Sequence, residues 1–574
     1  MHPCLQITEL LDIIFRQLDE DPVFSACTLA SLALTCRMFV EPALDVLWGR
    51  LTSFGPLITL FPEDAWWRID TPSGKSFVTL LRPPESHEWD KFMRYAARVR
   101  HVVSSTPLQR VTEAHPPVYS ILLDHRPTNH LFPNLKRIEW YFDHIFPEDS
   151  IAQLSLLLCP RVTNIATYAL KVMPERLSKR LSDELMTFII GHINIQYIKL
   201  YCPHIRSLVT LIPTVISQNK IIRTLDVLQA YPLALHRDVW LELSRLPMLE
   251  KTTIFADEFL GSDQEWKQLV NSSELIFPSL RQVSIHATDL EKCSRCMNAI
   301  QSPFLERLDI SVTHAPTNQE VKVFFTNLAK RCANAPVQWL RFMSVVGCPR
   351  HDDSYVIDTD TLRILLSFRD VISCDIGFRC PVRADNAFLG DVAAAWAPTL
   401  QQLELGSSWR QRLDSPGVTL QGLLSLLAQC PLLGYLGLVF DPRVDEFKES
   451  YNAGLRPSRD VRGRNRLVKF SSGATTLRDL DDSDIVTLAG VLSDIIPSLA
   501  SFQSLWIRDG PENLPGDEDP DDVDETEEWR RLIALHKEMS AIRTQERVWR
   551  MKAKAREAKA KAKAAKAKAK AKAV

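Results

Sequence analysis

The chain of 574 residues is 45% hydrophobic and 24% charged, which is typical of soluble globular proteins, and its length predicts several domains or one elongated repeat domain with appendages. It has no run of about 18 consecutive apolar residues, and no basic stretch followed by an apolar core at its start, so we expect neither a membrane span nor a secretory signal. The net charge of −2 conceals ten Lys or Arg and one Glu within residues 551–574, so the tail is basic and the remainder acidic.

A small helical module is predicted for residues 1–55. Its three helices are expected over residues 9–18, 24–36 and 40–51. Thr8 is placed as the N-cap of the first helix, and Pro42 in the first turn of the third, where its missing N–H costs nothing. A module of this size buries a small fraction of its surface, so it should gain stability from a partner or from the domain that follows.

The first of these helices is amphipathic. At about 100° per residue, five apolar side chains share one arc, which we expect to be buried in the module's own core: Leu10, Leu11, Ile14, Phe15 and Leu18. Ile13 lies outside this arc, among polar residues. It is either exposed incidentally or contacts another chain, and the sequence leaves both interpretations open.

Three ordered blocks within the module resemble an F-box. They are LQITELLDIIFRQL at residues 5–18, LASLALTCR at 29–37 and EPALDVLW at 41–48, and the last is similar to F-box proteins that are numerous in fungi. The resemblance implies binding to a Skp-type adaptor, which links to a cullin–RING ubiquitin ligase. The family usually has a proline where this chain has Thr8, so weaker adaptor docking is one expectation.

The resemblance also implies which residues bind the adaptor. These positions are Leu5, Ile7, Glu9, Leu10, Ile13, Ile14, Leu29, Leu32, Leu34 and Trp48. Some of them must instead build the core of the module. The sequence separates the two sets only at Ile13, through its position on the helical wheel.

A repeated pattern follows, in which a helix-like segment leads to a proline and then to L-x-x-L-x-L. Clear copies begin at Pro133, Pro278, Pro303, Pro398 and Pro431, and weaker ones at Pro160, Pro203, Pro247, Pro336 and Pro497, with a degenerate copy at residues 371–378. Successive copies from Pro247 onward lie 25 to 33 residues apart, or twice that distance. A period in this range indicates a solenoid, because one unit cannot bury its apolar face alone.

Each unit should contribute a strand with inward leucines and a helix, such as one over residues 419–430. This arrangement resembles leucine-rich repeats of the ribonuclease-inhibitor type, without their asparagine ladder. The predicted fold class is therefore α/β: a three-helix F-box module, then an irregular leucine-rich-repeat solenoid, then a helical or disordered basic tail. Residues 56–130 are assigned to a linker or first irregular repeats, and residues 131–509 to the solenoid.

The strand face of such a solenoid could bind a target or could only separate other parts of the protein. Binding is preferred, because solenoids expose an extended surface. The target-binding residues are unknown. Positions between the strand leucines, such as Gln282, Arg307 and Glu404, are candidates.

Three further segments differ in composition. Residues 441–472 are predicted to be a basic insertion, either a solvated loop or a contact for an acidic target, and residues 510–528 an acidic linker. Residues 529–574 form the tail, whose start is expected to be helical. Its apolar residues at helical spacing could cap the solenoid or pair with another helix, and capping is preferred: Leu532, Leu535, Met539, Ile542 and Trp549.

The alternating Ala and Lys at the end of the tail have no packing face and no interleaved aromatic residues. They could direct nuclear import or make nonspecific contact with polyanions, or could be inert; sequence-specific nucleic-acid binding is not expected.

Motifs for catalysis are not found. Cys293 and Cys296 form a C-x-x-C without a second ligand pair, and residues 351–353 (His-Asp-Asp) have no matching cluster elsewhere. Phosphate-loop, dinucleotide, nucleophile-elbow and zinc-protease motifs do not occur. We therefore expect no enzymatic activity, no cofactor and no metal. The twelve cysteines have no regular spacing, which fits reduced thiols in the cytoplasm or nucleus.

The sequence therefore predicts a substrate-recognition subunit of an SCF-type cullin–RING ubiquitin ligase. The module would bind the Skp-type adaptor, and the repeats would bind an unknown target protein. The alternative is a repeat-based interaction scaffold without a role in ubiquitin ligation.

Overall fold

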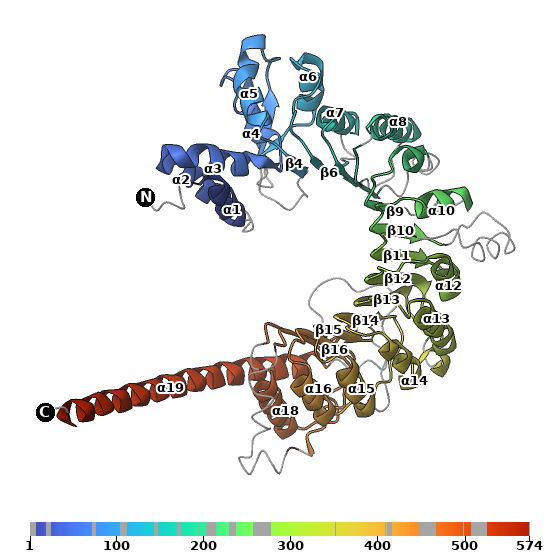
Figure 1. Cartoon of the computed structure of the whole chain (residues 1–574), viewed down its shortest axis with the longest axis vertical. Coiled ribbons are helices and arrows are strands. Elements are labelled where there is room, and N and C mark those ends of the chain that lie inside the picture. Colours follow the sequence, from blue (N-terminus) through green and yellow to red (C-terminus); the bar gives the residue numbers. More distant parts are fainter. Residues whose placement is uncertain are drawn as a thin grey trace. The chain divides into compact units, whose positions relative to one another are not determined.

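The structure is a computed structural model of the whole chain (Figure 1). It describes all residues except 1–6, 19–24, 72–75, 104–111, 143–146, 169–173, 193, 202–213, 229–236, 257–276, 350–351, 408, 410–415, 446, 448–465, 497–498, 507–524 and 573–574. The chain divides into two compact units. Unit 1 comprises Met1–Arg281 and Ala299–Ser302, and unit 2 comprises Gln282–Asn298 and Pro303–Val574.

Unit 1 begins with the three predicted helices, which are confirmed with small shifts at their ends: α1 (Thr8–Leu18), α2 (Ser25–Thr35) and α3 (Arg37–Gly49). The prediction that Thr8 caps the first helix is wrong. Helix α1 begins at Thr8, so Thr8 lies inside the helix and not before it, and the amide of Leu11 donates to the carbonyl of Ile7. The placement of Pro42 in the first turn is also wrong, because α3 begins earlier than expected, directly after the extended Cys36.

The rest of unit 1 is a run of short parallel strands that alternate with helices. The strands pair in the order β1 (Arg50–Leu51), β4 (His101–Val103), β6 (Arg137–Tyr141), β7 (Asn164–Tyr168), β8 (Tyr197–Tyr201), β9 (Thr224–Leu228) and β10 (Lys251–Phe255). The helices are α4 (Gly55–Ile58), α5 (Trp89–Ala96), α6 (Pro117–His125), α7 (Pro147–Leu157), α8 (Glu175–Gly191) and α10 (Arg237–Ser244). A small separate sheet holds β2 (Trp66–Asp70), β3 (Ser76–Leu80) and β5 (Glu113–Ala114), near the 3-10 helix η2 (Ser86–Glu88).

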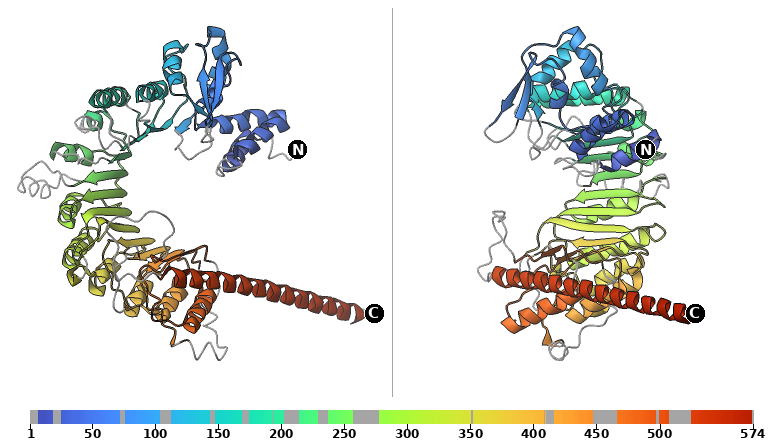
Figure 2. Two further views of the ribbon diagram at one scale, coloured as in Figure 1. Left: turned by 180° about the vertical axis from the view of Figure 1, so that it is seen from behind. Right: turned by 90° about the vertical axis from the view of Figure 1, so that its left-hand side faces the viewer.

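Unit 2 repeats the same alternation. Its parallel strands follow the chain order β11 (Gln282–Ala287), β12 (Arg307–His314), β13 (Trp339–Val346), β14 (Ser373–Gly377), β15 (Gln402–Leu405), β16 (Tyr435–Leu438), β17 (Lys469–Ser471) and β18 (Ser501–Gln503). Its helices are α12 (Leu290–Ala299), α13 (Asn318–Arg331), α14 (Thr359–Arg363), α15 (Asn386–Trp396), α16 (Leu420–Gln429), α18 (Asp482–Ile495) and α19 (Thr526–Lys572), with 3-10 helices η3 (Asp353–Tyr355) and η4 (Ile364–Ser367). Figure 2 shows the strands of this unit stacked side by side, with α12 to α16 on one side of them.

The predicted strands lie where the proline pattern places them. All five clear copies and the degenerate copy contain a parallel strand, and their leucine positions are buried, as at Leu400, Leu403 and Leu405. The predicted helix over residues 419–430 is α16, with Thr419 and Cys430 as its caps. The chain is thus mixed α/β, with parallel strands in both units. The repeats stack because each strand and helix bury apolar faces against each other and against the next pair. Among the weaker copies, Pro203 and Pro497 lie outside the described residues.

The C-terminal segments depart from their predicted bounds. Strand β17 lies inside the predicted basic insertion, which therefore ends before Lys469; most of that insertion and most of the acidic linker fall outside the described residues. Helix α19 confirms the predicted helix and packs against α18. Its buried residues include Leu532, but Ile542 and Trp549 are exposed, so the predicted capping stripe is correct only at its beginning.

The start of α19 covers the last strand of unit 2. The ring of Trp529 lies 5.9 Å from that of Phe502 in β18, and His536 contacts the same ring at 5.9 Å. Arg543 pairs with the buried Asp494 of α18 at 3.2 Å. Through these contacts, the start of α19 covers the apolar surface of β18, the last strand of unit 2. None of the helices in the described part of the chain is long and apolar enough to cross a membrane.

Candidate functional site

The core of the N-terminal module is small. Leu11 and Phe15 of α1 pack with Leu29 of α2 and with Ala43 and Val46 of α3, and these five side chains are buried. Helix α1 contacts α3 more extensively than α2, so the buried seam along α1 is narrow. The seam uses only one pair of residues one turn apart on the helix.

The prediction that the whole apolar arc of α1 is buried is therefore wrong. Leu10, Ile14 and Leu18 are exposed, and so are Ile7 and Ile13, the last at 58%. At about 100° per residue, four of these five residues (Ile7, Leu10, Ile14 and Leu18) share an arc of about 80° beside the buried pair, and the fifth, Ile13, lies about 60° beyond Leu10 with Gln17 between them. We call the five residues the α1 stripe. A contiguous exposed aliphatic surface of this kind is what marks an interaction site, whereas a single exposed aliphatic residue does not.

The other positions that the resemblance implied are divided between core and surface. Leu34, near the end of α2, is 88% exposed, whereas Leu29 lies in the core and Leu32 packs partly against it. Glu9 is exposed at the start of α1. Leu5 lies outside the described residues. The outward members of the predicted set are thus mainly those on α1, together with Leu34.

Trp48 faces the following domain. Its ring packs on that of Tyr95 in α5, with centroids 4.8 Å apart. Beside this pair, the guanidinium of Arg98 donates to Asp45 and Glu41 of α3. Helix α3 then continues into β1, which pairs with β4. The module is therefore joined to the first strands of unit 1 by packing, ion pairs and sheet hydrogen bonds.

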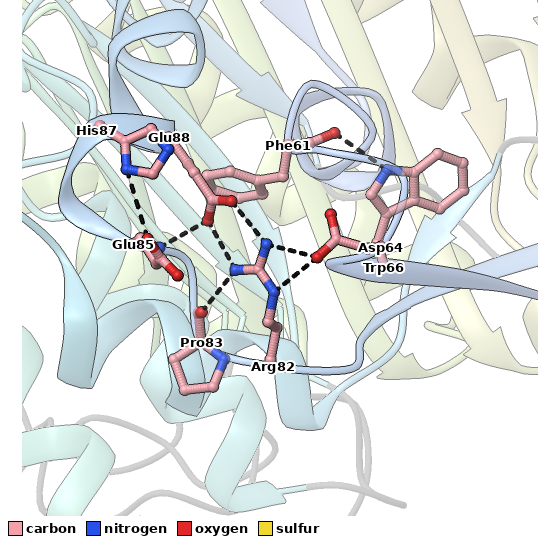
Figure 3. Close-up of polar contacts among 8 residues, drawn as sticks. All are labelled: Phe61, Asp64, Trp66, Arg82, Pro83, Glu85, His87 and Glu88. Carbon is pink, nitrogen blue, oxygen red and sulfur yellow. Dashed lines mark hydrogen bonds and ion pairs between the residues drawn. The ribbon is translucent and has the colours of Figure 1, made fainter.

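A second polar cluster of unit 1 lies beside the small sheet (Figure 3). The guanidinium of Arg82 donates to both carboxylate oxygens of Glu88, at 2.7 and 2.8 Å, and to Asp64 at 2.8 and 3.0 Å. The hydrogen bonds from Arg82 and from the Glu85 amide lower the pKa of Glu88 to about 2. The donors and acceptors of this cluster are used within the fold, so its role is to hold the chain around η2 in place.

The strands of unit 2 carry polar residues on the face opposite the leucines. One register row on this face takes one residue from each strand from β12 to β18, and six of the seven are polar: Asp309, Arg341, Asp375, Glu404, Gly437, Ser471 and Gln503. Within the row, the guanidinium of Arg341 lies 3.9 Å from the carboxylate of Asp309 and 3.4 Å from that of Asp375. One cation thus stands between two anions.

A pocket of about 540 Å³ opens along this row between β13 and β18, and we call it the strand-face pocket. Its lining includes Asp375, Glu404, Tyr435, Met343 and Phe502. The ring of Phe502 itself packs against Phe470 and Trp529 on the leucine side of the strands. Its volume lies within the range of small-ligand and side-chain pockets. The lining mixes carboxylates with apolar surface.

The carboxylate of Glu404 is fixed at the base of the strand-face pocket. One oxygen accepts from the amide of Ser407 at 2.6 Å, and the other from the hydroxyl of Tyr435 at 2.5 Å. The hydroxyl of Ser407 donates in turn to that of Ser471, at 3.0 Å. Glu404 is only 6% exposed, so its position is set by the fold.

Burial and like charges affect the ionisation of the pocket. Burial raises the pKa of Asp375 to about 6, and the negative charges of Glu404 and Asp309 add to this shift, while Arg341 opposes it. Burial and the neighbouring Glu404 also raise the pKa of Tyr435. Burial is the larger cause of both shifts, and the neighbouring negative charge adds to it. The strand-face pocket is therefore suited to a positively charged group.

The three candidate target-binding residues have different surroundings. Glu404 lies in the strand-face pocket, Arg307 lies over the ring of Trp339 with its guanidinium carbon 5.0 Å from the centroid, and Gln282 is half-buried on β11. Sequence reasoning missed Asp375. Asp375 has the same place in its unit as Glu404, between two buried strand residues, and this equivalence was the available signal.

The described residues do not contain a group of three or more His, Cys, Asp or Glu that could hold a metal ion. Cys293 and Cys296 are both buried in α12. Asp352 accepts a hydrogen bond from the amide of Ser354 at 3.0 Å and caps η3, and His351 lies outside the described residues.

Comparison of the sequence with protein-family models and with curated proteins found no match. The chemistry of this chain is therefore inferred from its own surfaces. Two of them stand out in the described part of the molecule, the aliphatic α1 stripe in unit 1 and the acidic strand-face pocket in unit 2.

Proposed function

We propose that this protein is the substrate-recognition subunit of an SCF-type cullin–RING ubiquitin ligase. The N-terminal module is an F-box that binds a Skp-type adaptor, and the strands and helices that follow are an irregular leucine-rich-repeat solenoid that binds a target. The observation that carries this proposal is the α1 stripe, which the core of the module leaves exposed.

The stripe has the properties of an adaptor surface. Five aliphatic side chains along three turns of one helix can insert into a groove of a partner, which is a common mode of helix recognition. Burying them would remove substantial apolar area from water, at roughly 25 cal/mol per Å². The same contact would stabilise a module of roughly 50 residues that has a five-residue core of its own.

The connection of the module to unit 1 supports a receptor role. A ligase subunit must hold its target at a defined position relative to the ligase. The contacts of Trp48 with Tyr95, and of Arg98 with α3, restrict rotation of the module at its junction with β1. Most of the cysteines in the described part of the chain are buried, which fits reduced thiols in the cytoplasm or the nucleus.

The test is capture of the purified full-length chain by a purified Skp-type adaptor. Ile13→Asp should abolish capture, because it places a charge on the α1 stripe about halfway along the helix. Leu81→Asp is the matched control: Leu81 is also an exposed aliphatic residue of unit 1, at 61%, but lies outside the module. Capture that survives Ile13→Asp, or that is lost equally with Leu81→Asp, would contradict the proposal.

A second measurement separates a ligase subunit from a scaffold. The adaptor-bound protein should recruit the cullin and its RING subunit from purified components. Adaptor binding without cullin recruitment would favour an interaction scaffold that lacks a ligase role.

A further inference from the structure

The strand-face pocket is a hollow that two glycines keep open. A Cβ atom at Gly437 would lie 1.8 Å from a carboxylate oxygen of Glu404, so another residue there would displace that side chain. A Cβ at Gly377 would lie 3.2 Å from a carboxylate oxygen of Asp375, which is tighter than most contacts. Gly437 lies inside β16 and Gly377 ends β14; glycine inside a strand weakens a sheet and often marks the close approach of another group. The glycines therefore leave room for the two carboxylates on the strand face, where Asp375 is partly exposed and Glu404 is 6% exposed.

The charges around the pocket do not cancel. Asp309, Asp375 and Glu404 stand in the same register row, and Arg341 is the cation that pairs with the first two. The groups that donate to Glu404 are the neutral amide of Ser407 and the neutral hydroxyl of Tyr435. Among the described residues that line the pocket or stand in this row, negative charge is thus in excess.

We propose that the strand-face pocket receives an arginine side chain of the target protein. This assignment rests on the proposed function in one respect, namely that the strand face is where the target binds. A planar guanidinium can donate to carboxylate oxygens on two neighbouring strands at once, which the point charge of a lysine does less well. The ring of Tyr435 and the thioether of Met343 supply apolar surface for the aliphatic stem and for the face of the guanidinium.

The volume is consistent with this occupant. About 540 Å³ exceeds the needs of one side chain, so the pocket can also take in backbone on either side of the arginine. The recognised element is then an extended segment with a central arginine. An acidic or phosphorylated segment would meet the uncompensated carboxylates and be repelled.

The experiment uses the purified full-length chain without adaptor. Binding is followed by fluorescence anisotropy with a fluorescein-labelled peptide, Gly-Ser-Gly-Ser-Arg-Ser-Gly-Ser-Gly. Two matched peptides replace the arginine by citrulline, which has nearly the same shape without the charge, or by lysine. We expect saturable binding of the arginine peptide, and binding at least about tenfold weaker for citrulline and several-fold weaker for lysine.

Variants locate the binding in the pocket. Asp375→Asn and Glu404→Gln should each weaken binding of the arginine peptide by about fivefold or more, and Asp353→Asn, on the exposed η3, should not change it. Asp375 is partly exposed, so its variant remains informative if Glu404→Gln fails to fold. Equal binding of the arginine and citrulline peptides overturns the proposal, as does unchanged binding by Asp375→Asn. Equal binding of lysine overturns the guanidinium assignment.

Failure of this inference and failure of the proposed function are distinguishable. Peptide binding is measured without the adaptor, and adaptor capture is measured without the peptide. Ile13→Asp should leave peptide affinity unchanged, and Asp375→Asn should leave adaptor capture unchanged.

Discussion

The division of helix α1 into a buried pair and an exposed stripe can be tested with two substitutions of similar chemistry. Leu11→Ala removes a side chain that is 2% exposed and belongs to a core of five residues. Truncation of a buried leucine typically lowers the free energy of unfolding by about 2–5 kcal/mol. Ile13→Ala removes a side chain that is more than half exposed, and such a change usually alters stability by less than about 0.5 kcal/mol.

Hydrogen–deuterium exchange of the full-length chain reads out the two effects locally. A module of roughly 50 residues has little stability in reserve, so Leu11→Ala should accelerate exchange throughout α1, α2 and α3. Ile13→Ala should leave exchange in these helices unchanged. Ile13→Ala should instead weaken adaptor binding about tenfold, which corresponds to about 1.4 kcal/mol of binding free energy. Faster exchange in Ile13→Ala, or normal exchange in Leu11→Ala, would show that the buried and exposed sides of α1 are wrongly assigned.

Two further outcomes follow from unit 2. Burial and like charges raise the pKa of Asp375 to about 6, so its carboxyl group is mostly neutral at pH 5 and charged at pH 7.5. The affinity for the arginine peptide should therefore rise as the pH rises through about 6. A pH-independent affinity in anisotropy titrations would contradict this. Trp529→Ala should lower the free energy of unfolding of unit 2 by about 3–5 kcal/mol, because the ring is fully buried against Phe502. Thermal unfolding measures this change. Trp549→Ala, which removes an exposed tryptophan of the same helix, is the control.

The strands of this chain could be predicted because their signals are local. A proline ends one segment, and leucines at fixed offsets begin the next, so the position of β15 or β16 follows from six or seven residues. The first helix shows the limit of this approach. Periodicity identified the apolar residues of α1, but the width of the buried seam depends on how α1 lies against α3, and that packing is decided by residues far along the chain.

The strand-face pocket shows a second limit. Asp375 and Glu404 are 29 residues apart, and they meet only because β14 and β15 pair in the register that sets them opposite each other. A shift of one residue would turn one of the carboxylates toward the core. The sequence marked Glu404 as a candidate by its place between two leucines, but which side chains surround it is a property of the paired strands.

The negative charge of Glu404 is unfavourable for the stability of the fold and favourable for the binding of a cationic ligand. Taking a carboxylate out of water is unfavourable unless its partners compensate for the loss, and hydrogen bonds from neutral groups compensate less well than a buried cation does. The fold has no need of charge in this row, because the next two strands carry Gly437 and Ser471 at the same register. A glutamine could accept from the amide of Ser407 through its one oxygen and donate to the hydroxyl of Tyr435 through its amide nitrogen, without a charge. The buried charge of Glu404 therefore destabilises the folded protein. A positively charged ligand that pairs with the carboxylate would offset this destabilisation and gain binding free energy from it.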